Sequence, residues 1–124
     1  MMIDRIFILA AGLCGAAGVA LSAAAAHIGG GNVATAAQLL LFHAPALLAI
    51  GLFGGNLLLR TGGSVLLVGA LLFAGDLLMR HYTGNRLFPF AAPTGGTLMI
   101  AGWIIVGLSA LLPGARATPD QGRP

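Results

Sequence analysis

Among the ionisable side chains within or beside the long apolar runs of this chain, four are candidates for a shared site: His27, His43, Asp76 and Arg80. Ionisable groups inside hydrocarbon are costly, so each is a candidate for function by default. A histidine titrates near neutral pH and could relay a proton, and two histidines on adjacent helices could ligate haem or a metal ion. We therefore treat the four as a candidate polar or ligand-binding cluster, without assigning a metal.

The same residues have a structural interpretation, which we favour. Asp76 and Arg80 are four residues apart, the spacing of an ion pair on one helix face. His43 could be neutral and donate a hydrogen bond to a facing helix, as polar side chains between membrane helices do. No Ser-His-Asp spacing, phosphate-binding loop or HExxH motif is present. We expect no enzymatic activity and no cofactor.

Three neighbours of this candidate cluster need separate interpretation. Pro45 cannot donate to the carbonyl of Leu41, so we expect a bend and a freed carbonyl near His43. Gln38 lies about 140° from His43 around a helix, so the two should not face one ligand. Trp103 falls near the middle of an apolar run, where packing is its expected role.

The elements that must position these side chains follow from composition. The chain has 124 residues, of which 58% are hydrophobic and only 7% are charged. A soluble domain has roughly a quarter of its residues charged, so the surface here must face mostly lipid. The net charge is +3, but the arginines are scattered singly, which excludes a nucleic-acid surface. The sequence indicates an integral membrane protein whose first partner is the bilayer.

Four apolar runs are long enough to span, since a transmembrane helix needs about 20 residues. We predict an all-α, up-down-up-down bundle with helices at about 6–26, 35–55, 64–81 and 93–112. The breaks are a glycine-rich stretch at 27–32, a turn at 60–64 and a loop at 83–92, and Pro113 ends the last helix. Residues 1–112 form one domain, and 113–124 a short disordered cytoplasmic tail.

Arginines suggest the orientation of this bundle. Arg5, Arg60, Arg116 and Arg123 fall on one side of the predicted membrane, and Arg80 and Arg86 on the other. Because cytoplasmic loops carry an excess of basic residues, this distribution favours both termini in the cytoplasm.

Small residues recur along the first two helices at the spacing that lets membrane helices approach closely. The helix-packing candidates are Gly12, Gly15, Ala16, Gly51 and Gly55. The only cysteine, Cys14, excludes an internal disulfide and a cysteine-based zinc site. This density of small residues favours a protein that acts by packing, including as a homo-oligomer or with a membrane-complex partner.

Short motifs in a fixed order give the chain a family resemblance. They are Ala26-His27, Thr35-Ala36, Phe42-His43-Ala44, Phe73-Ala74-Gly75, Pro93-Thr94-Gly95-Gly96 and Gly102-Trp103. Together they resemble domain-of-unknown-function family 423, a group of small bacterial inner-membrane proteins. The resemblance implies four transmembrane helices in the inner (plasma) membrane and supplies no catalytic residues. The chain departs from the family pattern at Asp76, where a small hydroxyl residue is usual, and at Pro45.

Three functions stay open at this point. The first is a structural or accessory protein that acts through helix packing. The second is a small transporter or channel-like oligomer that moves a proton, metal or solute through an intramembrane cluster containing His43 and Asp76. The third is haem or metal binding through His27 and His43.

Overall fold

The computed structural model describes residues 2–114 and folds them into four helices, with no strand in that range. The helices are α1 (Met2–Ile28), α2 (Gly31–Phe53), α3 (Leu57–Thr83) and α4 (Ala91–Ser109). Each is long and apolar enough to cross a membrane. The all-α, four-span prediction is confirmed, while the tail expected at 113–124 lies outside the described residues from position 115 onwards.

The turn predicted at 60–64 is wrong, because α3 begins at Leu57 and runs through it. The break lies earlier, at residues 54–56, where two glycines and an asparagine separate α2 from α3. Asn56 caps α3, since its Oδ1 accepts a hydrogen bond of 2.9 Å from the backbone N–H of Leu59. Residues 60–64 therefore belong to a membrane-spanning helix.

The other helix ends differ from the predicted bounds by smaller amounts. The turn between α1 and α2 shortens to Gly29 and Gly30, and α2 begins at Gly31 rather than at residue 35. Gly29 ends α1 in the left-handed region (φ 64°), and its N–H donates to the carbonyl of Ala25. α4 begins at Ala91 and ends at Ser109, three residues before the predicted end.

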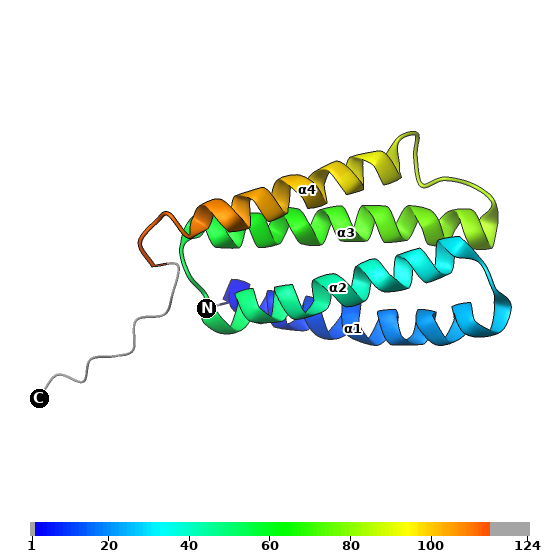
Figure 1. The fold of residues 1–124 in the computed structure, drawn as a ribbon, viewed down its shortest axis with the longest axis horizontal. Helices are drawn as coiled ribbons and strands as arrows, with labels where there is room; N and C mark the ends of the chain where they lie inside the picture. The colour runs from blue at the N-terminus through cyan, green and yellow to red at the C-terminus, as the bar shows by residue number, and fades with distance from the viewer. Residues whose placement is uncertain (1, 115–124) are drawn as a thin grey trace, which may run out of the picture.

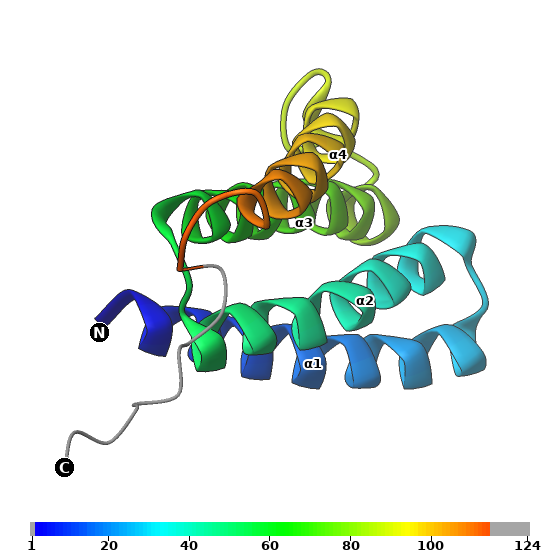
Figure 2. The same ribbon diagram turned by 60° about the vertical axis from the view of Figure 1, so that its left-hand side comes forward.

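The four helices are layered in chain order. Figure 1 shows α1 and α2 as one antiparallel hairpin and α3 and α4 as a second that lies over the first. Figure 2 shows α1 and α4 on the outside of this arrangement, with α2 and α3 between them. The close helix pairs are accordingly α1 with α2, α2 with α3, and α3 with α4. α2 and α3 thus carry the contact between the hairpins.

Apolar side chains fill the contact between the hairpins. Phe7 of α1, Leu47 and Ile50 of α2, and Leu77 of α3 belong to one buried cluster. A second, smaller cluster lies between α3 and α4 and consists of Leu66, Ala70 and Met99. The larger cluster joins three of the four helices, so the two hairpins form one packed unit.

Glycines let α3 and α4 approach closely. A Cβ added to Gly62 would lie 3.2 Å from the carbonyl oxygen of Gly102, and one added to Gly69 would lie 2.8 Å from that of Gly95. Gly62 and Gly69 are seven residues apart on α3, and Gly95 and Gly102 are seven residues apart on α4. The two helices therefore meet at two levels along their length. Small residues with this spacing allow backbone contact between membrane helices.

The small residues predicted to pack α1 and α2 divide into two groups. Gly15 and Gly51 lie at the α1–α2 contact, where a Cβ on Gly51 would be 2.8 Å from Cγ1 of Ile8. Gly12 has no atom within 4 Å of such a Cβ, and Ala16 is exposed. Gly55 lies in the turn, because α2 ends at Phe53. Among the described residues, Gly12, Ala16 and Gly55 therefore lie outside the close contact between α1 and α2.

Candidate functional site

His43 lies in the middle of α2 and is only 4% exposed. Its Nδ1 is 2.7 Å from the carbonyl oxygen of Leu39, and its Nε2 is 3.2 Å from the indole Nε1 of Trp103. A carbonyl only accepts and an indole N–H only donates. Nδ1 is therefore the donor and Nε2 the acceptor, which assigns a neutral imidazole protonated at Nδ1.

The hydrogen bond between His43 of α2 and Trp103 of α4 joins the two hairpins, although these two helices do not pack against each other along their length. Trp103 comes from α4, and the ring centroids are 5.8 Å apart with the planes inclined at 48°. The indole is 45% exposed, so its apolar face contributes to the lipid-facing surface. Trp103 therefore does more than the packing expected from its position, because its N–H also donates a hydrogen bond between the hairpins.

Asp76 forms a second polar centre and is fully buried. Its Oδ2 is 2.8 Å from Nη2 of Arg80, and its Oδ1 accepts a 3.0 Å hydrogen bond from the backbone N–H of Leu87. Leu87 lies in the loop between α3 and α4. The carboxylate therefore fastens that loop to α3, while Arg80 balances its charge.

The predicted cluster separates into parts in the structure. Asp76 and Arg80 are brought together, whereas His27 is exposed at the end of α1. His43 is twelve residues after the start of α2, about 18 Å along the helix, which is deeper than a start at residue 35 implied. Within residues 2–114, no group of three or more His, Cys, Asp or Glu side chains could hold a metal ion. Both ring nitrogens of His43 already have partners in the chain.

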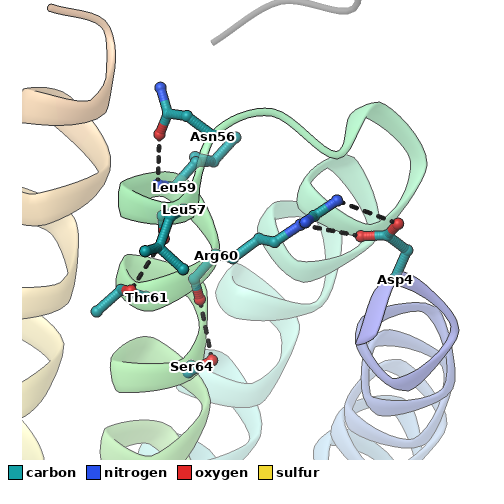
Figure 3. A network of polar contacts seen from close by, with 7 residues as sticks. All are labelled: Asp4, Asn56, Leu57, Leu59, Arg60, Thr61 and Ser64. Carbon is teal, nitrogen blue, oxygen red and sulfur yellow. Dashed lines mark hydrogen bonds and ion pairs between the residues drawn. The ribbon is translucent and has the colours of Figure 1, made fainter. Parts of the chain in front are cut away.

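A third polar centre, which the sequence motifs do not predict, lies at the end of the bundle that holds the N-terminus. Figure 3 shows Arg60 of α3 pointing toward Asp4 of α1. The Nε atom of Arg60 is 3.4 Å from Oδ1 of Asp4. Asn56 not only caps α3 but also donates a 2.9 Å hydrogen bond from Nδ2 to the carbonyl oxygen of Ser109 at the end of α4. α3 is thereby tied to both outer helices. An asparagine after two glycines is a recognisable helix-start signal, and it could have located this centre.

Comparison with known proteins supports the resemblance drawn from the motifs. A family model described as "Protein of unknown function (DUF423)" matches residues 15–96. A UPF0382 membrane protein of Haemophilus influenzae is 36% identical over 66 residues, 52% of this chain and 53% of that protein. A UPF0382 membrane protein of Staphylococcus haemolyticus is 28% identical over 115 residues, 85% of this chain and 94% of that protein.

The relatives differ in how much of their length is matched. The chain spans about half of the Haemophilus protein and nearly all of the Staphylococcus haemolyticus protein. A UPF0382 membrane protein of Staphylococcus saprophyticus is 31% identical over 97 residues, which cover 77% of this chain and 79% of that protein. No solved structure matches the chain significantly.

Proposed function

Because the chain belongs to the DUF423 family, whose relatives here are membrane proteins, we propose that it is a structural or accessory protein of the bacterial inner membrane. It acts through helix packing, without enzymatic activity, and both of its termini lie in the cytoplasm. The relatives come from bacteria. The four apolar helices supply the spans.

The observation that carries this proposal is that the buried polar side chains are all paired within the chain. Among the described residues these are His43, Asp76 and Ser109. His43 hydrogen-bonds to Leu39 and Trp103, and Ser109 donates a 2.6 Å hydrogen bond to the carbonyl of Val106. Asp76 accepts from Leu87 through Oδ1, and its Oδ2, which has no hydrogen bond within residues 2–114, is held by the ion pair with Arg80. A transport or ligand site needs groups that can exchange partners, whereas His43 joins α2 to α4 through Trp103 and Asp76 holds the loop at Leu87 to α3.

The orientation rests on the arginines. Arg5 and Arg60 lie in the first turns of α1 and α3, whereas Arg80 lies in the last turn of α3 and Arg86 in the loop that follows it. Figure 1 shows that α1 and α3 begin at the same end of the bundle. Arg116 and Arg123, outside the described residues, follow α4 and add to the first group. A reporter that is active only in the cytoplasm should be active when fused to the C-terminus and inactive when inserted at residue 85. The reverse pattern would contradict the orientation.

Flux measurements separate this function from the transporter hypothesis. We expect proteoliposomes containing the purified chain to dissipate a proton gradient no faster than empty liposomes, and to show no divalent-metal uptake. We also expect His43→Ala to lower the stability of the protein without changing flux. Flux above the empty-liposome rate that disappears in His43→Ala would establish the transporter instead, with Ser22→Ala as the control for an exposed polar residue on α1.

A further inference from the structure

The lipid-facing side of α2 carries an amide that has no partner among the described residues. The Gln38 side chain is exposed and makes no hydrogen bond to any residue that the structure describes. It stands seven residues after Gly31, so its backbone lies about 10 Å inside the start of the helix. With no water in the hydrocarbon to replace a missing partner, an unsatisfied amide at this depth is costly.

Three hydroxyl side chains on α3 and α4 avoid this cost within their own helix. The hydroxyls of Thr61, Ser64 and Thr97 each donate to the carbonyl four residues earlier, at 2.9, 2.9 and 2.8 Å. Gln38 makes no such bond in the described part of the chain. Its two donors and its acceptor are therefore available to a group outside the chain.

Gln38 begins a seam along α2. The exposed residues of this seam are Gln38, Phe42, Pro45, Ala49 and Leu52. Their alternating spacing of four and three is that of a left-handed helix pair, in which a single buried amide fixes the register. Phe42 and Leu52 are 66% and 63% exposed, so the seam can accept a partner helix. Pro45, which has no N–H, also deprives the nearby Leu41 carbonyl of its usual donor.

We propose that a second copy of this chain covers the seam, and that the two Gln38 amides hydrogen-bond to each other across a two-fold axis. This proposal rests on the proposed packing function, and it identifies the partner as a second copy of the chain and the contact surface as the seam on α2. A two-fold axis along the membrane normal places identical residues at the same depth and opposite one another. An amide both donates and accepts, so two identical amides satisfy each other, which a lipid chain cannot do.

Energy transfer between labelled copies in liposomes, at a series of protein-to-lipid ratios, measures the association. We expect the wild-type chain to form dimers, and Gln38→Leu to weaken the association by roughly tenfold, the scale of interhelical polar bonds in membranes. Gln38→Asn keeps a donor and an acceptor and should restore part of the loss. Ser22→Ala, which removes an exposed hydroxyl on α1, should leave the association unchanged. Helix content and unfolding of each variant verify that the fold is kept.

Cysteine cross-linking locates the face independently of Gln38 variants. In a Cys14→Ala background, Ala49→Cys should form disulfide-linked dimers in membranes, because position 49 lies in the seam. Ile100→Cys, which is 66% exposed on α4, should not. A monomer at every protein-to-lipid ratio, an unchanged association in Gln38→Leu, or cross-links through α4 alone would each overturn the proposal. The packing function would fail on a different measurement, namely flux in proteoliposomes.

Discussion

The contact inside the second hairpin and the contact between the two hairpins are built in opposite ways. Between α3 and α4, glycine backbones touch: a Cβ on Gly69 would lie 2.8 Å from the carbonyl oxygen of Gly95, and a Cβ on Gly95 would lie 2.7 Å from that of Gly69. Between the hairpins, large apolar side chains such as Leu47 and Leu77 fill the space. Polar bonds, including that from Trp103 to His43, then cross it.

The difference follows from the solvent. Lipid chains are as apolar as the helices, so burial alone gives membrane helices little reason to associate. Glycine contacts supply dispersion over a long, close approach, whereas wider contacts leave room for side chains with hydrogen-bonding groups. A directional bond adds what apolar packing lacks, a fixed register. The second hairpin should therefore be sensitive to added volume, and the contact between hairpins to lost polar groups.

The largest expected effect is from Gly95→Ala in α4. The new Cβ would lie 2.6 Å from the backbone N of Phe73, and backbone atoms cannot rotate away as a side chain can. We expect a loss of about 3 kcal/mol in the free energy of unfolding, the upper part of the range for overpacking. Unfolding in mixed micelles with increasing denaturing detergent measures it.

Gly107→Ala is the matched control for that measurement. Gly107 is also in α4, but nothing lies within 4 Å of the Cβ it would gain. The substitution should leave stability unchanged or raise it by up to about 1 kcal/mol, because alanine is the better helix former. Equal losses in the two variants would show that the close approach of α3 and α4 is not what stabilises the hairpin.

The next effect tests the contact between the hairpins by a double-mutant cycle of His43→Leu and Trp103→Phe. Each single variant removes one partner of the hydrogen bond, and the double variant removes both. We expect a coupling free energy of about 1 kcal/mol, as for polar bonds between membrane helices. The measurement is the unfolding free energy of the four proteins. A coupling of zero would mean that Trp103 contributes only packing.

Part of this comparison could be predicted from the sequence. Four long apolar runs with few charges leave no other arrangement than spanning helices, because every backbone group must be satisfied inside lipid. The pairing of Asp76 with Arg80 was also predictable, since a spacing of four on one helix brings the two side chains together without any tertiary information.

The rest depended on contacts between distant residues. His43 and Trp103 are sixty positions apart, and no local pattern links them. The sequence predicts a turn at Gly62 and Gly63, because paired glycines break helices in water. In this fold Gly62 is where α4 approaches α3, and the contact with that helix outweighs the low helix propensity of glycine. The capping role of Asn56 depends on where α3 begins, so it could not be predicted with the turn placed at 60–64.

The smallest effect is expected at the end of the bundle shown in Figure 3, where the ion pair of Arg60 and Asp4 joins α3 to α1. The two side chains are 21% and 19% exposed, so water and salt reach part of each side chain, although Nε and Oδ1 themselves are buried. Arg60→Gln should lower the unfolding free energy by about 0.5 kcal/mol, the scale of partly exposed ion pairs. At a salt concentration of about 1 M the Debye length is only about 3 Å, so the attraction between the two charges is screened. Raising the salt to this concentration should therefore reduce the difference in unfolding free energy between wild type and variant. The difference measured for His43→Leu should persist in the same salt, because no net charge is involved. A salt-independent loss in Arg60→Gln would mean that packing of the arginine stem, not its charge, holds this end of the bundle together.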